Sequence, residues 1–164
     1  MAFTAADVKN LREMTGVGMM DCKKALAACE GDIEKAIDYL REKGLAKAAK
    51  KQSRIAAEGV VGAYICKECG TGALVEVNCE TDFVGKNEKF VDFVKGVAAT
   101  VAANKPADLD ALMACKFNGT ENTVTEQQQE MVLVIGENIK VRRFARFADG
   151  VSVAYVHALS LIHI

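Results

Sequence analysis

The spacing of hydrophobic residues changes from a strand pattern to a helix pattern near the middle of the chain. Val75, Val77 and Cys79 alternate with polar residues, which is the period of a half-buried strand. From Phe90 to Val101, hydrophobic residues then recur three or four positions apart, which predicts an amphipathic helix. The rest of the chain is organised around this strand-to-helix corner.

The corner itself contains Thr81, Asp82 and Phe83, and two interpretations of it are open. In the first, Asp82 caps the coming helix and Phe83 packs into the core. In the second, the corner is a loop tip that presents an acid and an aromatic side chain to a partner. Spacing alone favours the first interpretation.

Residues 1–44 predict three short helices. Thr4 and Asp7 have the spacing of a capping box at the first helix, and a Gly-Val-Gly turn separates it from the second. Asp32 is expected to cap the third helix, which we expect to end at Gly44. Three helices of this length predict a small bundle of the ubiquitin-associated type. Such a bundle is a binding module or a spacer and has no room for a catalytic pocket.

Four side chains of this bundle are candidates for a contact surface. Lys9 and Arg12 are three positions apart and share one helix face, although simple solvation also accounts for them. Met19 and Met20 directly follow the glycine turn, and adjacent helical positions point about 100° apart. At least one of the two is therefore exposed, and exposed methionine provides an adaptable contact.

Residues 45–58 contain four basic residues before the first acid, and their alanine content favours a helix. A nucleic-acid contact is one interpretation, but the segment has no aromatic residue on which a base could stack. A solvated linker helix between two domains is the favoured interpretation.

Residues 59–147 predict an α+β unit with a small antiparallel sheet packed by helices. A turn at Gly70-Thr71-Gly72 joins the first two strands, and Pro106 stops the helix that follows the corner. Thr125 with Gln128 is expected to open a further helix.

A third strand is predicted from Ile139, closely after the glycine that ends the preceding helix at position 136. The run Arg142-Arg143-Phe144 interrupts the alternation of this strand, which predicts a β-bulge. A last strand is expected from Val151 to His157.

Composition and charge exclude some classes of protein. With 51% hydrophobic and 26% charged residues, the chain is typical of a soluble globular protein. Its net charge of -1 argues against a protein that coats nucleic acid, although the first 57 residues carry 11 Lys and Arg against 8 Asp and Glu. There is no signal-peptide pattern and no apolar run of about 18 residues, so a cytoplasmic location is expected.

Catalysis has little support in the sequence, and neither an enzyme nor a cofactor is expected. A glycine-rich phosphate loop and a Ser-His-Asp set are missing, and both histidines fall within the last eight residues. Cys79 has no histidine nearby in sequence to activate it. Cys66 and Cys69 have the spacing of half a zinc site, but no second pair follows at a matching distance, so no metal is expected.

Several independent motifs, in the same order over residues 1–158, resemble bacterial elongation factor Ts. These motifs are Thr15-Gly16-Val17-Gly18-Met19-Met20-Asp21-Cys22-Lys23-Lys24-Ala25-Leu26, Gly31-Asp32-Ile33, Ala56-Ala57-Glu58-Gly59, Val75-Glu76-Val77-Asn78-Cys79-Glu80-Thr81-Asp82-Phe83-Val84 and Gly136-Glu137-Asn138-Ile139. The resemblance implies a guanine-nucleotide exchange factor that promotes GDP release from elongation factor Tu during translation.

The resemblance also implies which residues bind the partner. The family's exchange motif, which disturbs the partner's magnesium and phosphate site, matches Thr81, Asp82, Phe83 and Val84. The resemblance therefore favours the second interpretation of the corner, in which Asp82 and Phe83 face a partner. The N-terminal contact surface matches Lys9, Arg12, Met19 and Met20. The expected partner is elongation factor Tu, GDP-bound or nucleotide-free, with no direct contact to nucleic acid and no membrane.

The implied organisation has five parts. They are a three-helix domain (1–44), a basic linker helix (45–58), a first core subdomain (59–147), the start of a truncated second core subdomain (148–158) and a suspected non-native tail (159–164). Two alternatives remain: a small RNA-binding or ubiquitin-associated-like adaptor that acts through residues 1–58, and a zinc-dependent redox protein.

Overall fold

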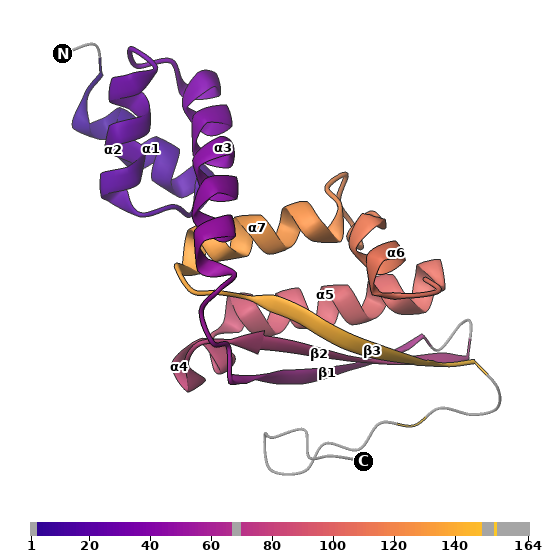
Figure 1. Cartoon of the computed structure of the whole chain (residues 1–164). Coiled ribbons are helices and arrows are strands. Elements are labelled where there is room, and N and C mark those ends of the chain that lie inside the picture. Colours follow the sequence, from indigo (N-terminus) through magenta and orange to yellow (C-terminus); the bar gives the residue numbers. More distant parts are fainter. Residues whose placement is uncertain (1–2, 67–69, 149–152, 154–164) are drawn as a thin grey trace.

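The computed structural model describes residues 3–66, 70–148 and 153 (Figure 1). Over these residues the fold mixes seven helices with one three-stranded antiparallel sheet, so the predicted α+β composition is confirmed. The elements in chain order are α1 (Ala5–Thr15), α2 (Met19–Ala28), α3 (Ile33–Lys51), β1 (Glu58–Cys66), β2 (Thr71–Cys79), α4 (Asp82–Gly85), α5 (Glu88–Asn104), α6 (Leu109–Ala114), α7 (Val124–Ile135) and β3 (Lys140–Phe147).

Helices α1, α2 and α3 form a small bundle around their own core. Its most deeply buried side chains are Leu11, Val17, Cys22, Ala25, Leu26 and Ala36. The predicted caps are confirmed: Thr4 N–H donates to Asp7 at 2.7 Å, and Lys35 N–H donates to Asp32 at 3.1 Å. Hydrogen bonds from Thr4 hold the pKa of Asp7 below its ordinary value, so the capping carboxylate is charged at neutral pH.

The prediction that the third helix ends at Gly44 is wrong, because α3 continues to Lys51. Gly44 lies buried where α3 crosses α7, and a Cβ atom at this position would lie 3.1 Å from Leu133 Cδ2. The glycine therefore permits close helix packing and does not end the helix. The expected separate linker helix is also absent, since residues 45–51 extend α3 and residues 52–57 run without helix to β1.

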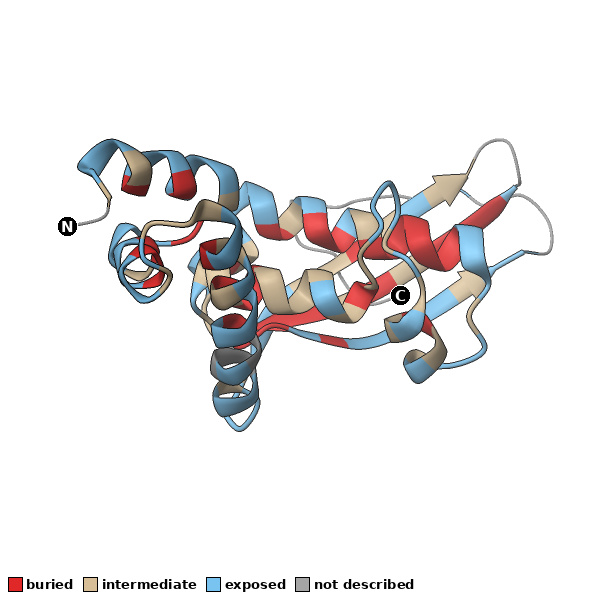
Figure 2. Cartoon of the chain, turned by 90° about the horizontal axis from the view of Figure 1, so that it is seen from above, coloured by how far each residue is buried: buried red, intermediate tan, exposed pale blue. Residues whose placement is uncertain are grey.

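The sheet has the order β1-β2-β3, with both neighbours antiparallel. Strand β1 pairs with β2 from Glu58 opposite Cys79 to Cys66 opposite Thr71, which confirms the predicted hairpin. The prediction that Thr71 and Gly72 form its turn is wrong, because both are paired residues of β2. Helix α5 covers one face of this sheet, where its Phe90, Val94, Val97 and Val101 are fully buried with Val75 and Val77 of β2 (Figure 2). Each such side chain contributes about 1.5–3 kcal/mol through removal from water.

The predicted bulge in β3 is confirmed. Glu76 lies opposite Arg143 and the next residue of β2 lies opposite Val141, so Arg142 is the extra residue. Arg142 donates to Glu76 at 3.1 Å, and Arg143 donates to the other oxygen of the same carboxylate. Burial acts to raise the pKa of Glu76, but the hydrogen bond and charge of Arg143, with the charge of Arg142, outweigh burial and lower it.

Helix α7 begins two residues earlier than predicted. Its capping box is formed by Thr123 and Glu126, with Thr123 N–H donating to Glu126 at 2.7 Å. The residues expected to form the cap have other partners: the Thr125 hydroxyl donates to Met113 O at 2.8 Å, and Gln128 accepts from Val141 N–H at 3.5 Å. These two side chains tie α7 to α6 and to β3.

The expected strand from 151 to 157 and the suspected tail from 159 to 164 lie outside the described residues, apart from Val153. Within the described ranges, every helix is too short or too polar to cross a membrane.

Candidate functional site

The strand-to-helix corner after β2 is built by Thr81. Its backbone is extended, with φ -127° and ψ 154°, and its hydroxyl accepts from Val84 N–H at 3.4 Å. Thr81 is therefore the N-cap of α4, and the interpretation of Asp82 as the cap is wrong. Helix α4 lasts one turn, after which Asn87 caps the separate helix α5.

The corner exposes its aromatic side chain. Phe83 is 82% exposed, so the interpretation that it packs into the core is also wrong. Its neighbour Val84 is buried in the core under the sheet and fixes the inner side of the short helix. Phe83 and Asp82 consequently project from the surface as adjacent side chains of one turn.

The acid at the corner is charged. Asp82 accepts from Lys86 Nζ at 2.8 Å, and this hydrogen bond, together with the charge of Lys86, lowers the pKa of Asp82. The same interaction raises the pKa of Lys86. Both side chains are more than half exposed, so the pair adds little stability and the carboxylate is free to exchange partners.

Two carboxylates connect the corner to the residues that follow α7. Glu137 accepts from the backbone N–H groups of Glu80 at 3.0 Å and Thr81 at 3.1 Å, and from the Thr81 hydroxyl at 2.6 Å. In return, Glu80 accepts from Asn138 N–H at 2.6 Å. We call these four bonds the Glu80–Glu137 interlock.

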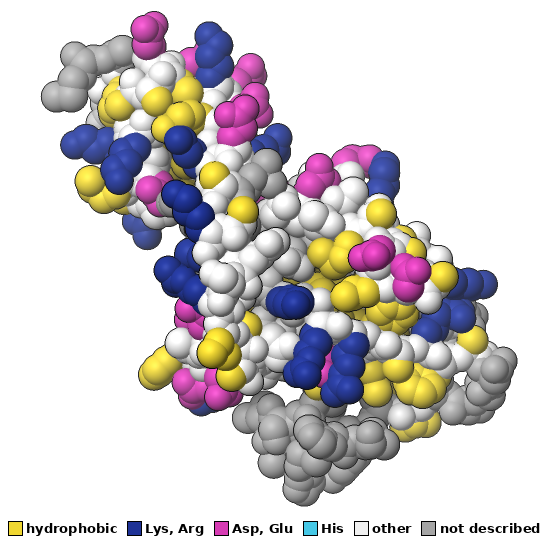
Figure 3. All heavy atoms as spheres, in the orientation of Figure 1, with side chains coloured by type: hydrophobic (Ala, Val, Ile, Leu, Met, Phe, Trp, Pro, Cys, Tyr) yellow, Lys and Arg dark blue, Asp and Glu magenta, His cyan; other side chains and the backbone are white. Residues whose placement is uncertain are grey.

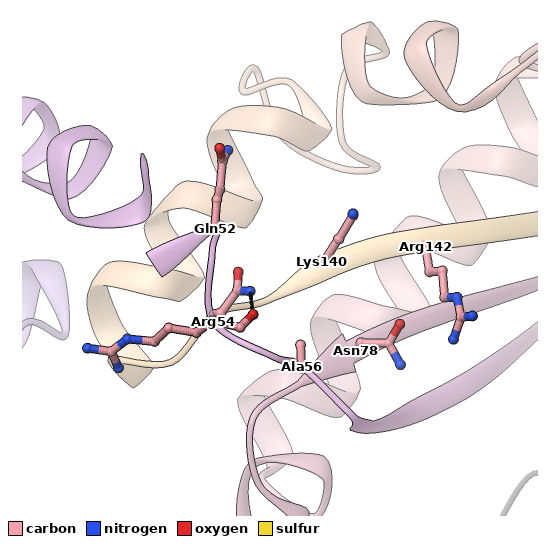
Figure 4. Close-up of a pocket in the computed structure, with 7 residues that line it drawn as sticks. Gln52, Arg54, Ala56, Asn78, Lys140 and Arg142 are labelled. Atoms are coloured by element: carbon pink, nitrogen blue, oxygen red, sulfur yellow. Dashed lines mark hydrogen bonds between the residues drawn. The ribbon is translucent and has the colours of Figure 1, made fainter. Parts of the chain in front are cut away.

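A third segment joins the interlock from the end of α3. Asn138 donates through its side chain to Arg54 O at 2.8 Å, the hydrogen bond dashed in Figure 4, and the Arg54 guanidinium lies 3.5 Å from Glu80. The next residue, Ile55, is 85% exposed. Sequence reasoning missed Ile55, although a lone aliphatic residue between a helix and a strand was the available signal.

Two residues behind the corner have structural roles. Gly59 has φ 155°, and a Cβ atom there would lie 2.3 Å from a carbonyl oxygen of β2, so only glycine fits.

Burial, with the charge of Glu137, raises the pKa of Cys79 to about 11, and its thiol donates to Thr81 O at 3.1 Å. Cys79 is thus a protonated core residue and not a nucleophile.

All four candidate residues of the N-terminal bundle lie on its surface, over which cationic, acidic and hydrophobic side chains are interspersed (Figure 3). Lys9 and Arg12 are exposed on α1, where Lys9 lies 3.7 Å from the Glu13 carboxylate. Met19 and Met20 are 43% and 63% exposed at the start of α2, so both face water. Met14, which sequence reasoning missed, is exposed as well.

The structure does not bring the two candidate surfaces together. Figure 1 shows α1 and α2 beside the N-terminal part of α3, whereas α4 lies beyond the C-terminal end of α3. The 19 residues of α3 span about 28 Å at 1.5 Å per residue. A partner that touches both surfaces must therefore be as large as a protein domain.

Two hollows of the described surface are large enough to describe. A shallow hollow of about 220 Å³ lies between the end of α3 and β3, and Figure 4 shows Arg54, Lys140 and Arg142 pointing in different directions. A groove of about 600 Å³ separates α1 and α3 from α7. No group of three or more His, Cys, Asp or Glu residues in the described part could hold a metal ion, and Cys69 lies outside that part.

An α+β fold that presents an exposed aromatic and a charged acid on a hydrogen-bonded corner is typical of a protein-interaction factor. Comparison with known proteins specifies the class further: the family described as Elongation factor TS matches residues 80–163. The chain belongs to the elongation factor Ts family, a family of translation elongation factors.

Curated relatives agree with this assignment. Elongation factor Ts of Syntrophotalea carbinolica is 52% identical over 99% of this chain and 54% of the relative. The protein of the same name from Trichlorobacter lovleyi is 53% identical over 96% of this chain and 52% of its own length. One from Clostridium perfringens is 52% identical over 94% of this chain and 51% of its own length. The chain thus spans about half the length of these relatives.

Proposed function

We propose that this chain acts as a guanine-nucleotide exchange factor for elongation factor Tu and promotes GDP release by disturbing the magnesium and phosphate site. The observation that carries this proposal is the exposed Phe83 beside the charged Asp82, on a corner that the interlock holds in place. An apolar ring this exposed costs free energy in water unless a partner covers it.

Exchange follows from thermodynamic linkage. A factor that binds the nucleotide-free GTPase more tightly than the GDP-bound form must weaken GDP binding by the same factor. The contact therefore needs only to distinguish the two states of the partner. No covalent step is required, and the chain needs neither a catalytic group nor a cofactor of its own.

Phe83 and Asp82 have separate roles in this proposal. The Phe83 ring inserts between elements of the GTPase that support the phosphate-binding loop and displaces them. The Asp82 carboxylate approaches the magnesium shell, where an added negative charge disfavours the ordered arrangement of ligands. Thr81 and Val84 hold the turn that presents both side chains.

The N-terminal bundle supplies a second contact through Lys9, Arg12, Met19 and Met20. Two cations give electrostatic attraction, and two exposed methionines adapt to an apolar surface. We assign the bundle to the ubiquitin-associated type and propose that it docks on the GTPase domain while the corner acts on the nucleotide site.

The direct test is the release of fluorescent GDP from purified elongation factor Tu, with and without this chain. We expect release to accelerate with increasing concentration of the chain and to saturate. The matched control is Tyr64→Ala, which removes a partly exposed aromatic from β1 and should act like the unaltered chain. Unchanged GDP release at saturating concentration would overturn the proposal.

An RNA-binding adaptor that acts through residues 1–58 has weaker support. Two of the four cations near the end of α3 already have partners within the protein, since Lys51 donates to Gly136 O and Arg54 lies beside Glu80. The adaptor would be favoured if an RNA bound the chain with a steep dependence on salt.

A further inference from the structure

We propose that Glu137 is a positioning residue for exchange, which fixes the direction of Phe83 relative to the N-terminal contact surface. This inference rests on the proposed function, because it assigns the part of the fold that orients the exchange motif. Glu137 lies 57 residues from Glu80 in sequence and accepts its backbone N–H.

The first step of the argument is that α4 cannot hold its own direction. A helix of four residues lies below the length at which helical hydrogen bonds sustain themselves. Its orientation depends on its attachments, which are Thr81 at the start, the buried Val84 on one side and Asn87 at the end, whose N–H donates to Val84 O at 2.9 Å. Glu137 accepts both the amide and the hydroxyl of Thr81, so it fixes the residue from which the turn that carries Phe83 begins.

The second step is that Glu137 connects this corner to the N-terminal bundle. It follows Gly136, the residue that ends α7, and Lys51 of α3 donates to the carbonyl of that glycine. Further along α7, Leu133 packs against the bundle core and meets α3 at Gly44. Helix α7 therefore contacts the bundle along its side and ends at the interlock.

The consequence is that packing and hydrogen bonds through α7 connect the two proposed contact surfaces. If Glu137 no longer accepts hydrogen bonds from Glu80 and Thr81, the bundle still docks on the partner. The Phe83 ring then samples many directions and must be ordered during each encounter. Ordering of this kind costs free energy in the step that expels GDP and leaves the initial contact unchanged. Such a defect lowers the maximal rate more than it raises the half-saturating concentration.

The variant Glu137→Ala leaves the amides of Glu80 and Thr81 without an acceptor. We expect the maximal stimulated GDP release to fall about tenfold, with less than about a threefold change in half-saturation. Glu137→Gln keeps a carbonyl oxygen for the two amides and should recover most of the rate. Hydrogen exchange of the Glu80 and Thr81 amides should become at least about tenfold faster in the alanine variant, while amides inside β2 remain protected.

The matched control is Glu126→Ala, which removes a capping carboxylate from the opposite end of α7. It should lower stability without changing the corner amides or the maximal rate. If Glu137→Ala does not fold, Glu80→Ala removes the acceptor of Asn138 N–H, beside Glu137, and should lower the maximal rate in the same direction but by a smaller factor. When both alanine variants fold, their combined defect should be smaller than the sum of the single defects, because they break one network.

Two results overturn the inference: a wild-type maximal rate in folded Glu137→Ala, or unchanged exchange of the corner amides. A failure of the proposed function looks different. In that case the unaltered chain does not accelerate GDP release, and hydrogen exchange alone decides whether Glu137 holds the corner.

Discussion

Replacing Phe83 by alanine tests whether this side chain contacts a partner or belongs to the core. The ring is 82% exposed, so its removal leaves no cavity, and the free energy of unfolding should change by less than about 0.5 kcal/mol. An aromatic side chain buries about 150–250 Å² when covered, which at about 25 cal/mol per Å² corresponds to about 3–5 kcal/mol at most for the exposed part. Truncating a residue at the centre of an interface commonly costs about 2 kcal/mol or more of binding free energy.

We therefore expect Phe83→Ala to reduce the rate constant per unit concentration for stimulated GDP release by about 30-fold or more, since 1.4 kcal/mol is tenfold. The assay is stopped-flow release of fluorescent GDP from elongation factor Tu at several concentrations of the chain. Thermal unfolding of the same preparations gives the stability.

The control is Phe90→Ala, since Phe90 is fully buried between α5 and the sheet. Truncation of a buried phenylalanine costs about 3–5 kcal/mol. For a chain of this size each kcal/mol lowers the melting temperature by about 2–4 °C, so the midpoint should fall by about 6–20 °C. The reasoning is refuted if Phe83→Ala destabilises the fold as strongly as Phe90→Ala while its folded fraction exchanges GDP normally.

Four further changes have defined outcomes. Asp82→Asn should give a smaller loss of exchange than removal of the ring, and the loss should depend on magnesium concentration in release assays. Replacing Met19 and Met20 together by alanine should raise the half-saturating concentration more than it lowers the maximal rate; a loss of stability alone would assign both to the core. Ile55→Ser should leave the melting temperature unchanged and weaken binding in titration calorimetry, because the side chain is exposed beside the interlock. The lowered pKa of Glu76 adds stability that is complete above its ordinary value of 4.5 and is lost as pH falls through the lowered value, so Glu76→Gln should flatten the acid side of the unfolding profile.

The sequence determined the features that depend on nearby residues. The capping box of Thr4 and Asp7, the cap at Asp32 and the helix end at Gly136 were predictable, because each bond joins residues a few positions apart. The bulge at Arg142 was predictable for the same reason, since a break in alternation is visible along one strand.

The candidate residues of the corner were predictable in position but not in exposure. Spacing placed Asp82 and Phe83 at a corner and favoured a cap and a core residue. The structure reverses both roles, because Thr81 takes the N-cap position and Val84 fills the space in the core. Which of two adjacent apolar residues in a single turn faces inward depends on the elements packed against that turn, and local spacing does not contain this information.

Contacts between distant segments were decided by the tertiary structure alone. Gly44 is placed where a glycine would end a helix, yet it lies inside α3. A glycine stands there because α7 approaches too closely for a side chain. Glu80 and Glu137 each occur in a recognisable motif, but nothing near them in sequence indicates that they exchange hydrogen bonds. A hydrogen bond requires its two atoms to meet within about 3 Å, and only the packing of α7 against the sheet and the bundle brings these motifs that close.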